Sequence, residues 1–272
     1  MLVTAVCSLK GGVGKTSVVL GLASAALAKG VPTLIVDLDP QADATTGLDV
    51  VPERSGDIAA VLTAPRRKVV EAAITPSGWS ADQPGILDVL QGSPAVAALD
   101  TPRATERALS RLSQALDKAD GYQLVLIDCP PSLGALTRTG LTASQRAIVV
   151  TEPALFSVTA ADRALNAIEE LRDTTAPSLQ PFGVMVNRYR ERSPEHRYRV
   201  SELAEMFGSL VIGPPVPERS ALQQAQGASR SVHSWPGQAA TELSRIFESH
   251  LSRLLRSADG AGRRRRTVPA AV

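Results

Sequence analysis

The chain has 272 residues, of which 44% are hydrophobic and 21% charged, and its formal net charge is +2. This length allows a substantial core in a single α/β domain, and no internal repeat or apolar run near the roughly 20 residues of a membrane span is present, which excludes repeat arrays and spanning proteins. Two cysteines and three scattered histidines indicate small buried side chains in a reducing compartment and no zinc site.

The first element in chain order is a strand over residues 2–7, followed by a glycine-rich loop and a helix that ends near Gly30. The loop comprises Lys10, Gly11, Gly12, Val13, Gly14, Lys15, Thr16 and Ser17. Its glycines let backbone N–H groups approach phosphate oxygens, and the helix N-terminus adds a positive dipole end. Lys15 then stands where a lysine reaches the outer phosphates, and the Thr16 hydroxyl stands where it ligates Mg²⁺. The strict phosphate-loop pattern requires glycine at position 9, where this chain has Leu9, so the motif is a variant with an additional lysine.

The second strand, over residues 33–37, ends in two carboxylates, Asp37 and Asp39, and Pro40 stops the element. Residues 50–119 contain several prolines and are the least readable part of the chain. We expect the portion before Ile86 to be a surface excursion, with a third strand over 86–90. A buried strand over 123–128 then delivers Asp128 at its carboxyl end, where open α/β sheets bind ligands.

Further strands are expected over residues 146–150, 182–187 and 210–212, with helices between most strands. Asn187 follows one of these strands, and its amide can both donate to and accept from a purine edge. The alternation predicts a doubly wound, mostly parallel β-sheet covered by helices on both faces. We expect one domain, which contains the phosphate loop, over 1–257 and a basic, flexible tail over 258–272.

These segments together resemble the ParA/MinD family of deviant Walker-A P-loop ATPases, and the D-x-D-P-Q sequence favours its ParA (Soj)-like branch. The resemblance implies ATP or ADP and Mg²⁺ as cofactors and a homodimer in the ATP state. Lys10 is implied to reach the partner's nucleotide, and Asp39 to hold the attacking water. The implied magnesium set is Thr16, Asp39 and Asp128. Asn187 and Pro217 are implied to lie near the adenine, in addition to the phosphate loop itself.

The resemblance further implies a slow ATPase that a ParB-like or cargo-adaptor partner stimulates. Members of the ParA branch bind nonspecific DNA as dimers and segregate chromosomes, plasmids or other cargo. No targeting segment precedes the first strand, so we expect a cytoplasmic protein. The resemblance implies that it is bacterial and associated with the nucleoid.

Charge patterning points to the same partner, because basic residues with interleaved tyrosines follow Asn187. The candidate DNA-binding residues are Arg188, Arg190, Arg192, Arg197, Arg199 and Arg219. A second basic cluster, which includes Arg253, Arg256 and residues 263–266, ends the chain. Such clusters neutralise phosphates and give salt-sensitive binding without sequence preference. The alternative for both clusters is a solvated face and a solvated tail.

Two other classes remain open at this point. A MinD-like membrane-cycling ATPase would use a carboxyl-terminal amphipathic helix, and residues 243–256 have apolar positions at helical spacing beside arginines. Membrane binding is nevertheless the less favoured interpretation, because such helices usually pack on the sheet. A metabolic ATP-dependent enzyme on the same scaffold, such as an amide ligase, is the other alternative. Cys129 follows Asp128 directly, which does not match the cluster-ligating cysteine of nitrogenase-iron-protein relatives.

Overall fold

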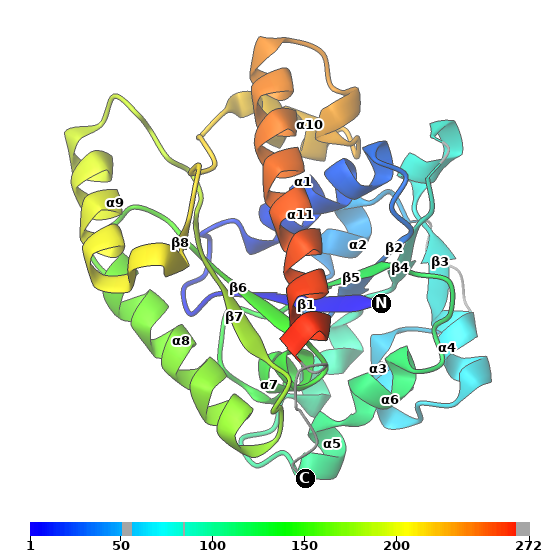
Figure 1. Ribbon diagram of the computed structural model, residues 1–272. Helices are drawn as coiled ribbons and strands as arrows, with labels where there is room; N and C mark the ends of the chain where they lie inside the picture. Colours follow the sequence, from blue (N-terminus) through cyan, green and yellow to red (C-terminus); the bar gives the residue numbers. More distant parts are fainter. Residues whose placement is uncertain (51–55, 84, 265–272) are drawn as a thin grey trace, which may run out of the picture.

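The computed structural model describes residues 1–50, 56–83 and 85–264, and its centre is an eight-stranded sheet with the strand order β3-β4-β2-β5-β1-β6-β7-β8 (Figure 1). All neighbouring strands are parallel except β3 and β4. The strands are β1 (Leu2–Cys7), β2 (Thr33–Asp37), β3 (Ile74–Pro76), β4 (Leu87–Leu90), β5 (Leu124–Asp128), β6 (Arg146–Thr151), β7 (Gln180–Val186) and β8 (Val211–Ile212). Strands β1, β2 and β5 are buried along their whole length, which explains their continuous apolar sequences.

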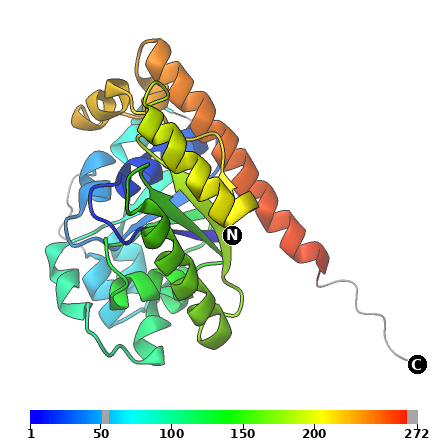
Figure 2. The ribbon, with the colours of Figure 1, turned by 90° about the vertical axis from the view of Figure 1, so that its left-hand side faces the viewer.

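Helices cover both faces of this sheet (Figure 2). One face packs against α1 (Lys15–Ala28), α2 (Asp43–Gly47), η1 (Gly78–Asp82), α10 (Ser220–Gly227), η4 (Val232–Ser234) and α11 (Gln238–Arg264). The other face packs against α3 (Ile58–Thr63), α4 (Arg67–Ala73), η2 (Pro94–Leu99), α5 (Glu106–Leu109), α6 (Arg111–Leu116), α7 (Ala135–Thr142), α8 (Ser157–Thr174), α9 (Pro194–Phe207) and η3 (Gly208–Leu210). The predicted doubly wound architecture is confirmed.

The helix that follows the phosphate loop is held by the last helix of the chain. Phe247 on α11 is fully buried, and a Cβ added at Gly21 on α1 would come within 2.2 Å of its ring. Only glycine therefore allows this close approach of α1 to α11. The ring thus packs directly on the backbone of the phosphate-loop helix.

The region that was expected to be a surface excursion before Ile86 contributes to the core, which corrects that expectation. Ile58, Val61 and Leu62 on α3 are buried at helical spacing, and Val70 on α4 packs in the same cluster. The short antiparallel strand β3 closes one edge of the sheet by pairing with β4. Three-residue strands and helices of six or seven residues carry too little periodicity to be recognised among the prolines.

Helix α11 continues to Arg264, beyond the domain boundary that was expected at 257. In Figure 2 its carboxyl-terminal end stands clear of the body of the molecule. Arg265 and Arg266 of the basic cluster lie outside the described residues. No helix in the part of the chain that the structure describes is long and apolar enough to cross a membrane.

Candidate functional site

The candidate site lies along the carboxyl edge of the central parallel strands. Because β2 and β5 are paired in register, Asp37 lies opposite Asp128. The phosphate loop follows β1, between β5 and β6 in the sheet. The segments that sequence analysis selected therefore meet at the topological switch point of the sheet, where α/β folds bind ligands.

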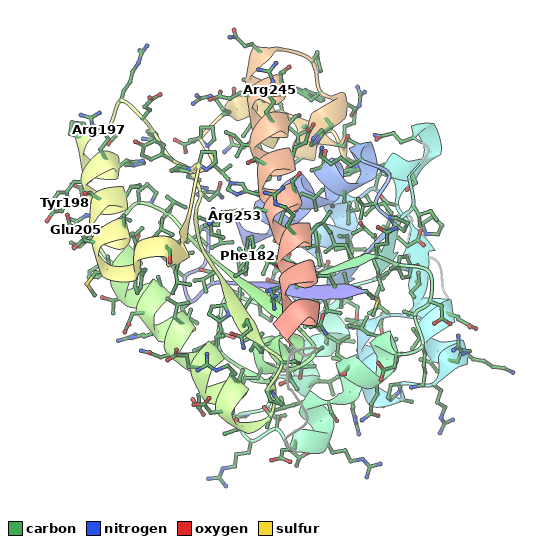
Figure 3. The ribbon with its side chains drawn as sticks, viewed as in Figure 1. Phe182, Arg197, Tyr198, Glu205, Arg245 and Arg253 are labelled. Carbon is green, nitrogen blue, oxygen red and sulfur yellow. The ribbon has the colours of Figure 1, made fainter. Side chains whose placement is uncertain are left out.

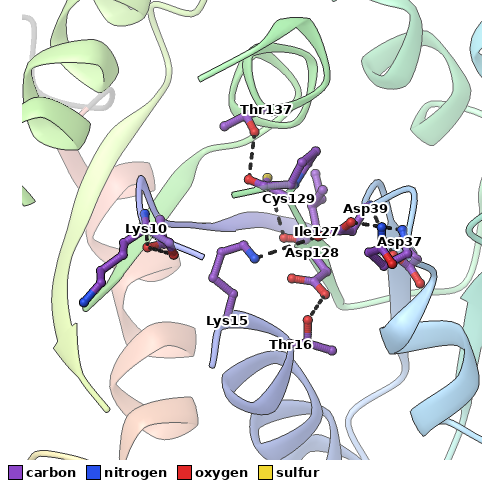
Figure 4. A network of polar contacts seen from close by, with 12 residues as sticks. Lys10, Lys15, Thr16, Asp37, Asp39, Ile127, Asp128, Cys129 and Thr137 are labelled. Carbon is purple, nitrogen blue, oxygen red and sulfur yellow. Dashed lines mark hydrogen bonds and ion pairs between the residues drawn. The ribbon is translucent and has the colours of Figure 1, made fainter. Parts of the chain in front are cut away.

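The phosphate loop has the conformation that its glycines permit. Gly12 and Gly14 have φ values of 79° and 84°, in the left-handed region that favours glycine, and α1 begins directly afterwards at Lys15. The loop therefore leads directly into the N-terminus of α1, and the free N–H groups and helix dipole at that end favour the binding of an anion. Lys15 is 7% exposed, and its Nζ lies 4.0 Å from Oδ2 of Asp39 (Figure 4).

A threonine and an aspartate form the part of the site that fits a magnesium ion. The Thr16 hydroxyl donates a hydrogen bond of 2.7 Å to Oδ2 of Asp128, which is fully buried. Oδ1 of Asp128 has no hydrogen-bond partner among the described residues. Burial raises the pKa of Asp128 to about 7, while Lys15 opposes this shift. A hard cation held by Thr16 and phosphate oxygens would compensate this buried carboxylate, so the donor set fits Mg²⁺.

The described residues of the site do not provide a complete set of protein ligands for a metal ion. Among the described residues, no three His, Cys, Asp or Glu side chains converge as metal ligands. Mg²⁺ commonly uses one or two carboxylates together with substrate phosphates. The geometry therefore fits a metal that arrives with a nucleotide.

Asp37 and Asp39, on either side of Leu38, have different surroundings. The Asp37 carboxylate is fully buried and accepts hydrogen bonds from Thr45 and from the backbone N–H of Asp39. Burial raises its pKa to about 6, although these hydrogen bonds act in the opposite direction. Asp39 is 8% exposed and accepts from the N–H of Gln41 at 3.0 Å.

The additional lysine of the loop turns away from the rest of the site. Lys10 Nζ forms an ion pair of 2.5 Å with Oε1 of Glu152, the residue after β6. In Figure 4 the Lys10 side chain extends in the opposite direction from Lys15. Sequence analysis did not select Glu152, although a charged residue at the end of a central strand is the same signal that selected Asp128.

Asn187 lies against the phosphate loop. Its Nδ2 donates to the carbonyl oxygens of Val13 at 2.8 Å and Gly14 at 3.4 Å, and a Cβ at Gly14 would lie 2.3 Å from the same nitrogen. Pro217 is buried beside the segment after β7, where it forms a parallel bridge with Tyr189. The structure thus places Asn187 against the phosphate loop and Pro217 beside Tyr189, two residues further along the chain. Their contact with adenine stays a prediction.

The candidate DNA-binding arginines fall into two groups. Acidic side chains pair with three of them: Arg190 with Glu218, Arg199 with Glu195 and Glu202, and Arg219 with Glu242. The others, Arg188, Arg192 and Arg197, are exposed and form no ion pair among the described residues. Helical spacing along the sequence could have indicated the pairing of Arg199, but not those of Arg190 and Arg219, because Glu218 and Glu242 come from other elements. Only the second group presents charge that is not already neutralised.

The two cysteines are buried and reduced at the same edge of the sheet. Burial raises the pKa of Cys7 to about 12 and raises that of Cys129 as well. Neither thiol is prepared to act as a nucleophile, because the reactive form is the thiolate.

A parallel doubly wound sheet with a glycine-rich loop between β1 and α1 defines the chain as a P-loop nucleotide-binding protein. A family model described as AAA domain matches residues 1–181. The chromosome partitioning protein ParA of Caulobacter vibrioides is 31% identical over 235 residues, which cover 85% of each protein. The chromosome-partitioning ATPase Soj of Thermus thermophilus is 29% identical, covering 92% of this chain and 95% of its own. The chain therefore belongs to the ParA/MinD family of P-loop ATPases.

Solved structures agree on the fold. A structure titled as cobyrinic acid a,c-diamide synthase from Mycobacterium smegmatis with bound ADP and magnesium is 27% identical, with a TM-score of 0.77 and coverage of 96% of both chains. A structure of a Cyanothece McdA variant in complex with ATP has a TM-score of 0.80 at 18% identity and covers 93% of this chain and 96% of its own. At 18% identity, the similarity to the McdA structure supports the fold assignment alone.

Proposed function

We propose that this protein is a ParA-like ATPase that acts as an ATP-dependent dimerising switch, binds DNA without sequence preference, and segregates or positions a chromosome, plasmid or other cargo. The observation that carries the proposal is the convergence of Lys15, Asp39 and the Thr16–Asp128 pair on one edge of the sheet. Partitioning relatives that match most of the chain support the same interpretation.

ATP and ADP with Mg²⁺ are the cofactors in this proposal. The loop from Lys10 to Ser17 binds the phosphates, and Asn187 and Pro217 lie on the side of the adenine. Thr16, Asp128 and Asp39 are the residues that would hold Mg²⁺, directly or through water. When bound, the metal neutralises charge on the phosphate oxygens. Family resemblance, the buried unpaired oxygen of Asp128 and the ADP and magnesium of a similar structure support this assignment.

Hydrolysis depends on positioning and electrostatic stabilisation by this chain's own residues. Lys15 binds the outer phosphates, Asp39 orients the attacking water, and Lys10 of each subunit reaches the nucleotide of the other. In the monomer Lys10 is bound to Glu152, so dimerisation has to break this ion pair. From the family resemblance we also propose a slow basal rate that a ParB-like or cargo-adaptor partner increases.

Replacing Asp39 tests the catalytic assignment. Asp39→Ala should retain ATP binding and ATP-dependent dimerisation but lose turnover, because the carboxylate that orients water is absent. ATP binding by fluorescence, dimerisation by sedimentation and phosphate release measure the three properties. Wild-type turnover by this variant would remove Asp39 from the catalytic role.

DNA binding is assigned to Arg188, Arg192 and Arg197, which lie before or on α9, and to exposed arginines of α11. Figure 3 shows the side chain of Arg197 projecting from α9 and those of Arg245 and Arg253 projecting from α11. We propose an ATPase domain over 1–257 and a basic tail over 258–272, whose arginines add positive charge for binding to DNA phosphates. The protein is proposed to act in the cytoplasm, on the nucleoid.

The apolar face of α11 does not favour the membrane-cycling alternative. Its residues Ala240, Leu243, Phe247, Leu251 and Leu254 are all fully buried in the core cluster that α11 shares with α1. A helix that binds a membrane needs its apolar face available to lipid. The described part of α11 therefore supports packing rather than membrane attachment.

An amide ligase is the second candidate, because one similar structure is titled cobyrinic acid a,c-diamide synthase. Such an enzyme would use ATP to activate a carboxylate for attack by ammonia. The buried thiols Cys7 and Cys129 are poor candidates for releasing that ammonia from glutamine. Incubation with cobyrinic acid, ATP and either ammonia or glutamine, followed by mass spectrometry, tests this candidate directly.

The deciding experiment measures binding to random-sequence duplex DNA with ATP, with ADP and without nucleotide across a salt series, alongside anionic liposomes. We expect ATP-dependent DNA binding that weakens steeply with salt, and no liposome binding. Liposome binding would support the membrane-cycling alternative. Binding to neither surface would contradict the proposed DNA-binding function.

A further inference from the structure

The carboxylate of Asp37 joins two ends of one short loop. It accepts hydrogen bonds from the backbone N–H of Thr45 at 2.9 Å and from the Thr45 hydroxyl at 2.8 Å. Its other oxygen accepts from the N–H of Asp39 at 3.2 Å. Asp37 ends β2 and Thr45 lies in the first turn of α2, so this one side chain closes the loop that contains Asp39.

The segment after β4 also contacts the Asp37–Thr45 pair that closes this loop. The hydroxyl oxygen of Thr45 accepts a hydrogen bond of 2.9 Å from the N–H of Gly92, which follows β4. A Cβ added at Gly92 would lie 2.7 Å from Cγ of Asp37, so the backbone there presses directly on the carboxylate. The Thr45 hydroxyl therefore donates to Asp37 and accepts from Gly92 at the same time, which fixes its orientation.

The loop closed in this way is too constrained to place Asp39 elsewhere without breaking these bonds. Ala42 occupies the left-handed region with φ of 55°, a conformation that costs free energy for a residue other than glycine. The N–H of Ala42 bonds to the carbonyl of Asp39 at 2.9 Å. The result is a carboxylate of Asp39 held 4.0 Å from Nζ of Lys15.

We propose that Asp37 and Thr45 are positioning residues for the ATPase reaction, which hold Asp39 at the phosphate site without contacting the nucleotide. This inference rests on the proposed function, since it assumes that Asp39 orients the attacking water. Buried polar networks whose members are all bonded give a rigid, single arrangement. A displacement of about 1 Å at a catalytic group can cost about a hundredfold in rate.

Substitutions at Thr45 test the proposal because valine has the shape of threonine but lacks the hydroxyl. Thr45→Val should lower kcat by about tenfold or more and leave KM for ATP within about twofold, since ground-state binding is untouched. Thr45→Ser keeps both hydrogen bonds and should restore most of kcat. The matched control is Thr33→Val, which removes a buried hydroxyl at the opposite end of the same strand.

Gly92→Ala disturbs the carboxylate of Asp37 from the segment after β4. It therefore tests the positioning role independently if Thr45→Val does not fold. The added methyl must displace the pinned Asp37 side chain, so kcat should fall again with little change in KM. Thermal unfolding of each variant reports the folded fraction.

The possible outcomes distinguish failure of the proposed ATPase function from failure of the positioning role. A wild type that does not hydrolyse ATP contradicts the proposed function itself. Wild-type kcat in both Thr45→Val and Gly92→Ala overturns the positioning role. Equal losses in Thr45→Val, Thr45→Ser and Thr33→Val that follow the folded fraction also overturn it, because they indicate a role in stability alone.

Discussion

At the scale of single residues, the site contains two lysines with different surroundings. Lys15 is buried beside Asp39, whereas the side chain of Lys10 is 45% exposed and paired with Glu152. An ion pair this exposed stabilises by only about 0.2–1 kcal/mol. In the proposed dimer, this weak pairing would let Lys10 leave Glu152 for a phosphate oxygen of the nucleotide bound to the second subunit.

Glu152→Gln should promote ATP-dependent dimerisation, because the competing carboxylate of the monomer is removed. Each dimer breaks two such ion pairs, one in each subunit, so we expect the dimer dissociation constant to fall by about two- to thirtyfold. Sedimentation velocity in ATP measures this change. Glu170→Gln, which removes an exposed carboxylate on α8 that lies 3.9 Å from Arg138, is the control and should leave the constant unchanged. Equal dimerisation of Glu152→Gln and wild type would contradict the competition.

Asp128 gives a prediction for pH dependence. Its pKa is raised to about 7 in the folded protein, above the ordinary value of an aspartate in the unfolded chain. The folded state consequently binds the proton more tightly, and stability of the nucleotide-free protein decreases as pH rises from about 4 to about 7. Asp128→Asn removes this loss, so it should raise Tm at about pH 8 more than at about pH 4. Equal shifts of Tm at both pH values, measured by calorimetry without nucleotide, would show that ionisation of buried Asp128 does not destabilise the protein.

At the scale of elements, the contact between α1 and α11 decides how firmly the phosphate-loop helix is held. Phe247→Ala leaves a cavity against the backbone at Gly21 and should destabilise the protein by about 3–5 kcal/mol. Urea unfolding measures the change. Phe156→Ala is the matched control, because Phe156 is 68% exposed and should give a change within about 0.5 kcal/mol. A similar loss for both variants would contradict this account of the packing.

The central elements could be predicted from the sequence because several independent signals coincide in them. The strands expected over 2–7 and 33–37 have the bounds of β1 and β2, and Asp128 lies where its strand pattern predicted. The strand β3 was missed because three residues with a proline give no measurable alternation. Short segments adopt their structure from the sheet edge on which they pack rather than from their own periodicity.

The candidate site could be predicted only in part for a similar reason. Its loop and aspartates follow strands and are visible along the chain. By contrast, the contacts of Lys10 with Glu152 and of Asp37 with Thr45 and Gly92 depend on which strands are neighbours in the sheet. Strand order is a tertiary property, so these partners became apparent only in the structure.

At the scale of the whole molecule, charge is distributed unevenly over the arginines that sequence analysis selected. Arg199 is already bonded to Glu195 and Glu202, whereas Arg192 and Arg197 are exposed without an acidic partner among the described residues. A phosphate gains little from an arginine whose charge is neutralised within the protein.

Arg192→Ala and Arg197→Ala should each weaken ATP-dependent DNA binding and reduce its salt slope by about one. Arg199→Ala should have a much smaller effect, since it removes a cation that is already paired. Fluorescence anisotropy with a random duplex across a salt series compares the three variants. A loss in Arg199→Ala as large as in the other two would show that the internal ion pairs do not limit DNA binding.

The packing of α1 against α11 also has a consequence for the order of events during synthesis of the chain. Helix α1 ends at Ala28 and α11 begins at Gln238, so the ribosome makes the two halves of this contact far apart in time. At about 5–20 residues per second, roughly 10–40 seconds of translation separate them. During this interval the phosphate-loop helix has an uncovered apolar face. We therefore expect a nascent chain to hold its phosphate loop firmly, and to bind nucleotide well, only once α11 has been made and has packed on α1.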